Sequence, residues 1–170
     1  MSLPIQYGYF ENPQGYELVK LRDEPRRLLW LLPLPSKAIY EFKLKDDDPL
    51  AFVMPDGTKV QPDRHEAETD MGSIPPAFQI VFRKDRFLKS YIFHDSGYVN
   101  HGLYFKAKGQ DEYEFVEMSR LEVDAMLQQM IYASGGNMLE RHAIYRAVRM
   151  GGGIPWKGGK TPTPKVCVRL

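Results

Sequence analysis

The chain has 170 residues, with 23 Lys and Arg against 22 Asp and Glu, and a single cysteine. A net charge of +1 provides no long-range field that would attract nucleic acid, so a nucleic-acid partner is not expected. One cysteine excludes an internal disulfide framework and a zinc cage made of cysteines. The length fits one domain, which we assign to residues 1–156, followed by an extended basic tail at residues 157–170.

Neither a targeting signal nor a transmembrane segment is expected. The N-terminus has no basic segment followed by an apolar one, which a secretory signal requires. The most apolar stretch, residues 28–34, is interrupted by Pro33, whereas a membrane-spanning helix needs about 20 apolar residues. We therefore expect a soluble protein that is made in the cytosol.

The first half of the chain has the pattern of β-strands and turns. Residues 16–21 and 38–44 alternate between apolar and polar side chains, as strands with one buried face do. Residues 51–54 and 58–60 flank Pro55-Asp56-Gly57, which predicts a hairpin. The prolines among the first forty residues are expected to keep the strands short or at sheet edges.

The second half has the pattern of helices. Apolar residues recur at helical spacing over residues 83–99, and two short strands are expected at residues 103–106 and 112–116. Ser119 and Glu122 form a capping box that begins a second helix, and Asn137 can cap a third, residues 138–150. The predicted fold class is α+β, with a β-rich N-terminal half containing hairpins, followed by about three helices.

One cluster of residues in the helical half could perform chemistry. His94 and Tyr98 are four residues apart and share a helix face. Asp124 lies at the edge of the apolar stripe of the next helix, where a carboxylate is costly unless it is paired. Pairing Asp124 with His94 and Tyr98 would orient the imidazole, and a histidine oriented by a buried aspartate can act as a general base. We therefore consider His94, Asp124 and Tyr98 a candidate catalytic set.

Two further carboxylates could hold a metal ion near this set. Asp95 projects away from His94 and could bind a hard cation such as calcium, and Asp70 lies in a rigid loop before the first helix. A zinc site formed from His94, Asp95, Asp124 and either His65 or His101 is an alternative, although no spacing requires it.

The same residues also allow a structural interpretation. A histidine and a tyrosine on an aromatic helix face are often core residues with satisfied hydrogen bonds. The basic residues of the last helix are interpreted as a solvated face; they are Arg141, His142, Arg146 and Arg149.

In four segments the chain resembles a family of phage and prophage proteins defined by a domain of unknown function. These are Thr-Asp-x-x-Ser-Ile-Pro at residues 69–75, Ile-x-His-Asp-x-x-Tyr at residues 92–98, Arg120 with Asp124, and Tyr-x-Ala-Val-Arg-x-x-Gly-x-x-x-Trp at residues 145–156. The resemblance implies a phage-encoded protein and no agreed activity. Association with the virion, with other phage structural proteins or host envelope components as partners, is our further expectation.

The His-Asp-x-x-Tyr helix followed by a helix with an aspartate also resembles, more distantly, the catalytic helix pair of phospholipase A2 enzymes. That resemblance implies that His94 is the base, Asp95 a calcium ligand, Asp124 the residue that orients His94, and Tyr98 the support of Asp124. The first hypothesis is a metal-assisted hydrolase of ester or envelope substrates. The alternatives are a non-catalytic virion or tail-assembly protein and a divalent-metal phosphohydrolase.

Overall fold

The computed structural model describes residues 7–28, 32–64, 67–69 and 84–158. Within these ranges a β-rich N-terminal half with antiparallel hairpins is followed by three long helices, with strands β7 and β8 between the first and the second, so the predicted α+β class is confirmed. The helices are η1, a 3-10 helix at Lys84–Phe87, then α2 Leu88–Asn100, α3 Arg120–Ala133, α4 Met138–Gly151 and the short α5 Gly153–Gly158. None of the described helices is long and apolar enough to cross a bilayer.

The larger sheet has five strands in the order β1-β4-β5-β7-β8. Their bounds are β1 Tyr9–Glu11, β4 Ala51–Val53, β5 Lys59–Gln61, β7 Gly102–Lys106 and β8 Glu114–Glu117. The predicted hairpin at Pro55-Asp56-Gly57 joins β4 to β5. Its turn requires a glycine because Gly57 has a φ of 88° and donates its N–H to the carbonyl of Met54.

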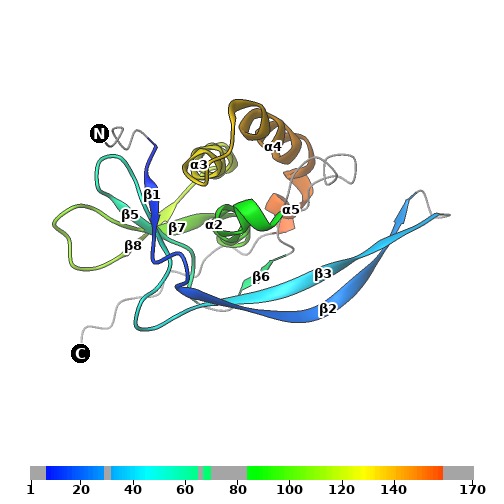
Figure 1. The fold of residues 1–170 in the computed structure, drawn as a ribbon, viewed down its shortest axis with the longest axis horizontal. Coiled ribbons are helices and arrows are strands. Elements are labelled where there is room, and N and C mark those ends of the chain that lie inside the picture. The colour runs from blue at the N-terminus through cyan, green and yellow to red at the C-terminus, as the bar shows by residue number, and fades with distance from the viewer. Residues whose placement is uncertain (1–6, 29–31, 65–66, 70–83, 159–170) are drawn as a thin grey trace.

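The smaller sheet, in the order β2-β3-β6, consists mainly of a long two-stranded ribbon (Figure 1). Its strands are β2 Tyr16–Leu28, β3 Leu32–Leu44 and β6 Ala67–Thr69. The expectation of short strands is wrong, but the edge positions expected of prolines are confirmed. β2 is an edge strand, and Pro25 lies at a register shift between Glu24 and Arg26. β6 pairs with β3 only at residues 40–42. At Pro33 and Pro35 the side of β3 opposite β2 therefore has no partner among the described strands, and none there requires the N–H group that proline lacks.

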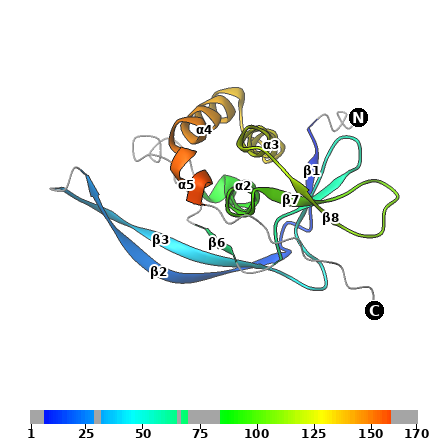
Figure 2. The same cartoon turned by 180° about the vertical axis from the view of Figure 1, so that it is seen from behind.

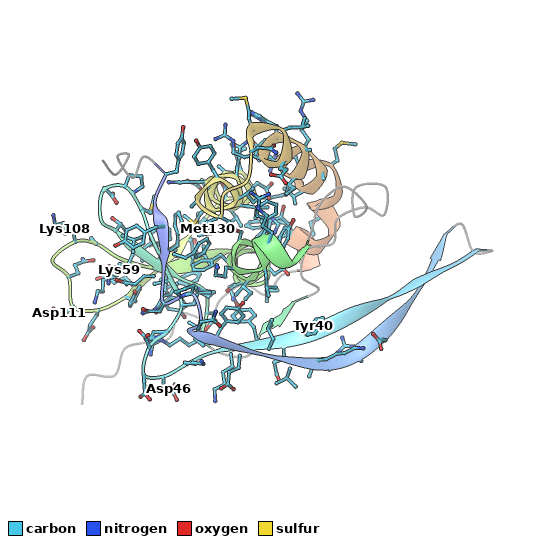
Figure 3. The ribbon with its side chains drawn as sticks, in the orientation of Figure 1. Tyr40, Asp46, Lys59, Lys108, Asp111 and Met130 are labelled. Atoms are coloured by element: carbon cyan, nitrogen blue, oxygen red, sulfur yellow. The ribbon has the colours of Figure 1, made fainter. Side chains whose placement is uncertain are left out.

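Helix α2 lies at the centre of the molecule, between the five-stranded sheet, the β2–β3 ribbon and the other helices (Figures 1 and 2). Three consecutive side chains face three different neighbours. Tyr91 packs with α3 and α4, Ile92 packs on Phe42 of β3, and Phe93 packs with the five-stranded sheet and α3. Met130 of α3, labelled in Figure 3, belongs to the same cluster as Phe93. Eight of the thirteen residues of α2 are buried, including Ser90, His94 and Ser96, so the helix is buried on most sides and the remaining elements are arranged around it.

The predicted capping box at Ser119 is present, and Asn137, predicted as a cap, forms a second capping box with Glu140. The Ser119 hydroxyl accepts from the N–H of Glu122, and Asn137 does the same for Glu140, so α3 and α4 begin where predicted. Residues 157 and 158, assigned to the tail from the sequence, instead complete α5, while residues 159–170 lie outside the described residues. Strands β1 and β6 were not predicted, because three residues are too few to establish a period and no turn signal marks them, as Pro55-Asp56-Gly57 marks the equally short β4 and β5.

Helices α2 and α3 approach closely at Gly97. A Cβ atom at this position would lie 2.8 Å from Cγ1 of Val123, which is buried and β-branched and therefore has little freedom to move away. The glycine thus sets the spacing between the two helices that carry the candidate site.

We expect Gly97→Ala to separate these helices. A matched control is Gly151→Ala, because a Cβ there would contact nothing within 4 Å. Both variants gain helix propensity, so the difference between them isolates the overpacking, which we expect to cost about 1–3 kcal/mol at Gly97. Urea denaturation of both variants measures it, and equal free energies of unfolding would contradict the close contact.

Candidate functional site

The candidate site lies where α2, α3 and the end of α4 meet. His94 and Tyr98 are one turn apart on α2, and their rings are in contact, with centroids separated by 4.2 Å. Because the Ser119 capping box fixes the start of α3, Arg120 and Asp124 follow one turn apart on the side that faces α2. The carboxylate of Asp124 is fully buried, so its charge must be compensated by protein groups.

One carboxylate oxygen of Asp124 binds both α2 side chains. Oδ1 lies 2.9 Å from Nε2 of His94 and accepts a 2.6 Å hydrogen bond from the hydroxyl of Tyr98. An ionised carboxylate can only accept, so Nε2 of His94 carries a proton and donates it. This contact fixes the orientation of the imidazole and leaves Nδ1 as its other titratable atom.

The second oxygen binds arginine. Oδ2 accepts a 2.7 Å hydrogen bond from Nη1 of Arg149, and Nε of Arg120 lies 3.7 Å away. Arg120 also donates to the hydroxyl of Tyr98 at 3.1 Å, and its Nη2 atom binds the carbonyls of Val148 and Arg149 at the end of α4. The carbonyl of Val148 also accepts from the N–H of Gly152, and Arg120 adds a side-chain donor there and at Arg149. Arg120 therefore helps to cap α4 while it supports the Asp124 network.

The network changes the pKa of both acidic and basic members. Burial alone would raise the pKa of Asp124, but hydrogen bonds from His94, Tyr98 and Arg149 outweigh it and hold that pKa below its ordinary value. Burial alone would lower the pKa of His94, but its contacts with Asp124 and Asp95 outweigh burial and raise it. The pKa of the Tyr98 hydroxyl is raised, chiefly by burial and next by its bond to Asp124, so it remains a donor.

The other side of the His94 ring faces Asp95. Nδ1 of His94 lies 3.7 Å from Oδ1 of Asp95, which is too long for a direct hydrogen bond but close enough for a charge interaction. The side chain of His94 is 7% exposed and that of Asp95 is 17% exposed. The histidine therefore lies between a fully buried carboxylate and a second carboxylate at the edge of solvent.

Of the residues predicted from the sequence, His94, Tyr98, Asp95 and Asp124 are brought together. Asp70 and His65 lie outside the described residues. His101 does not join this group, because its Nε2 lies 2.8 Å from the carbonyl of Trp156 and its ring stacks on the Trp156 indole. Among the described residues, no group of three or more His, Cys, Asp or Glu side chains is arranged to hold a metal ion.

Residue-level reasoning missed Arg149, Arg120 and Trp156 as members of the site. Arg149 was interpreted as part of a solvated face, yet it binds Asp124, and the edge of Tyr98 contacts Trp156 at a centroid distance of 5.2 Å. All three residues occur in the motifs on which the resemblance to the phage family depends. The motifs therefore pointed to these three residues, whereas side-chain periodicity alone did not.

Comparisons of the chain with protein-family models, with curated proteins and with solved structures find no match. The interpretation of the site therefore depends on its own geometry and on the resemblances of its motifs.

We expect Asp124→Asn to destabilise the protein strongly, because it removes the buried negative charge that Arg149 and His94 both contact. Removing one member of a buried ion pair costs about 3–5 kcal/mol. Asp23→Asn is the control, since Asp23 forms an exposed ion pair with Lys20 and its loss should cost less than about 1 kcal/mol. Chemical denaturation measures both, and similar losses would show that the Asp124 network contributes little.

The network should also make stability depend on pH. Because the pKa of His94 is raised in the folded state, its contribution is complete below its ordinary pKa of 6.5 and is lost as pH rises through the folded-state value. The contribution of Asp124 to stability depends on pH in the opposite direction. It is present above the ordinary pKa of 3.8 and is lost as the pH falls through the depressed pKa of the folded state. Free energies of unfolding between about pH 5 and 9 should decline on the alkaline side in the native chain but not in His94→Gln. His142→Gln, an exposed control, should keep the decline.

Proposed function

We propose that the protein is a hydrolase in which His94 is the general base and Asp124 and Tyr98 position it. The observation that carries this proposal is the 2.9 Å contact between Nε2 of His94 and Asp124. With Nε2 committed to the carboxylate, Nδ1 is the atom that can receive a proton from a water molecule. The partly exposed Asp95 beside Nδ1 places this nitrogen on the side of the ring towards solvent.

The proposed reaction is the hydrolysis of an ester bond. Nδ1 of His94 takes a proton from water as the water oxygen attacks the carbonyl carbon, and the resulting imidazolium returns that proton to the departing alkoxide. The products are a carboxylic acid and an alcohol, and the base is regenerated. Asp124 stabilises the imidazolium, and Arg149 keeps Asp124 ionised throughout.

Esters of an envelope lipid are the proposed substrates, and the basis is the resemblance of the helix pair to phospholipase A2 enzymes. In those enzymes calcium polarises the carbonyl, and Asp95 is the residue that matches the ligand position. Among the described residues, Asp95 belongs to no group of three or more His, Cys, Asp or Glu side chains that could hold a metal ion. The proposed reaction is therefore assigned to the side chains alone, and a calcium requirement is a question for the assay.

A second candidate is a non-catalytic virion or tail-assembly protein, and the environment of Asp124 favours it. The carboxylate already has Arg149, Arg120, His94 and Tyr98 around it, and His94 is almost fully buried. Such a network would hold three helices in register without any chemistry. The resemblance to phage proteins is compatible with either candidate.

We expect His94→Ala to reduce ester hydrolysis at least about a hundredfold, the smaller end of what a general base contributes. The assay uses short-chain esters and phospholipid vesicles, with and without added calcium or zinc. His142→Ala is the matched control, because this histidine is exposed and lies outside the network. The rate of the native chain should rise with pH as the raised pKa of His94 is passed, since only the neutral imidazole can accept a proton.

His94→Gln keeps a hydrogen-bonding side chain and separates lost chemistry from lost folding. If this variant melts as the native chain does but is inactive, His94 acts chemically. Equal activity of the native chain and His94→Ala, or no activity in either with any metal, would overturn the hydrolase proposal and favour the assembly candidate.

A further inference from the structure

A second feature, remote from the Asp124 network, is a pocket of about 440 Å³. It lies between the end of β5 and the β7–β8 hairpin, and no member of the Asp124 network lines it. Lys59 and Asp111, labelled in Figure 3, mark this end of the molecule, opposite the outer end of the β2–β3 ribbon. The volume falls in the range of pockets that bind small molecules.

The walls of the pocket are held by backbone contacts. Gln61 of β5 is paired in register with Tyr104 of β7. Beyond β5, the N–H of Asp63 donates to the hydroxyl of Ser96, a fully buried residue of α2, at 2.9 Å. In the β7–β8 hairpin the N–H of Ala107 binds the side chain of Gln110 at 2.9 Å. A pocket whose walls are fixed in advance loses little conformational entropy when it binds a ligand.

The lining combines tyrosine rings with groups that form hydrogen bonds. Tyr104 packs edge-on against Phe115 with a centroid distance of 5.4 Å, so its ring is held in place. Burial raises the pKa of Tyr104 and of Tyr113, so both hydroxyls stay protonated and can donate as well as accept. The side chain of Gln61 is 97% buried within the fold (3% exposed) and adds an amide that can do both.

The charges around the pocket oppose one another. Asp63, Asp111 and Glu112 line it together with Arg64, and Lys106 lies over the ring of Tyr113 at 5.5 Å. A cationic ligand would meet a cation already placed at that ring, and an anionic ligand would meet the carboxylates. The carboxylates outnumber Arg64 and repel an anion, while Lys106 already occupies the ring of Tyr113 at which a cation would bind, so a ligand without net charge fits best at that ring.

We propose that this pocket binds neutral sugar units of a saccharide chain. A sugar ring has an apolar face of C–H groups that packs on tyrosine, and a rim of hydroxyls that both donate and accept. Those hydroxyls match the amide of Gln61, the carboxylates and the guanidinium of Arg64. The inference does not depend on the proposed hydrolase function, because it requires neither His94 nor Asp124.

Titration of the isotope-labelled full chain, followed by NMR chemical shifts, tests the proposal. The probes are neutral tetrasaccharides of glucose and of N-acetylglucosamine, a cationic glucosamine tetramer, an anionic galacturonate tetramer and an uncharged tetrapeptide. We expect a neutral saccharide to bind, with shift changes concentrated at the backbone amides of Asp63, Tyr104 and Tyr113. Tyr113→Ala should weaken that binding about tenfold or more, as the loss of a central tyrosine does at other interfaces.

Tyr132→Ala is the matched control, because Tyr132 is partly exposed on α3 and does not line the pocket. It should bind as the native chain does, and so should His94→Ala, whatever happens to hydrolysis. Arg64→Gln, at an exposed position, should also weaken binding even if Tyr113→Ala fails to fold. Three results would overturn the proposal: no binding of either neutral saccharide, tighter binding of a charged tetramer or the peptide, or undiminished binding by both Tyr113→Ala and Arg64→Gln.

Discussion

The carboxylate of Asp124 is shielded from solvent, and the groups that compensate its charge come from three helices. His94 and Tyr98 reach it from α2, Arg120 from its own helix, and Arg149 from the end of α4. Burying an ion is costly, and the cost is met here only when all three helices occupy their native positions. The arrangement of the helical half therefore depends on this one charge, and so does any chemistry performed by His94.

Arg120 connects the carboxylate of Asp124 to Tyr98 of α2 and to the C-terminal end of α4. Its guanidinium reaches Asp124, the hydroxyl of Tyr98 and the last carbonyls of α4, so a single side chain serves as counter-ion, hydrogen-bond donor and helix cap. Trp156 then packs on Tyr98 and His101, which places α5 against the end of α2. The contacts that orient the imidazole and those that complete the fold are largely the same, which is why a catalytic and a structural interpretation share the same atoms.

The sequence predicted the elements with strong local signals. The capping box at Ser119, the cap at Asn137 and the hairpin glycine at Gly57 each act within a few residues, so their patterns could be interpreted directly from the sequence. The pairing of His94 and Tyr98 with Asp124 was also predictable. Helical spacing puts His94 and Tyr98 on one face, and a carboxylate at the edge of an apolar stripe needs a partner. The length of the β2–β3 ribbon and the inward turn of Arg149 were not, since both depend on which distant segments lie beside them.

The strand order of the five-stranded sheet has a consequence for how the chain folds. β5 and β7 are hydrogen-bonded neighbours, with Gln61 opposite Tyr104, yet α2 lies between them in the chain. Their pairing closes a loop that contains this central helix, and closing such a loop costs chain entropy before the sheet repays it. The pairing of β5 with β7 therefore holds together the two ends of the chain segment that contains α2, whereas the β2–β3 ribbon is a hairpin whose contacts are local in the chain. The sheet against which Phe93 packs is thus also the sheet that anchors both ends of the segment carrying His94.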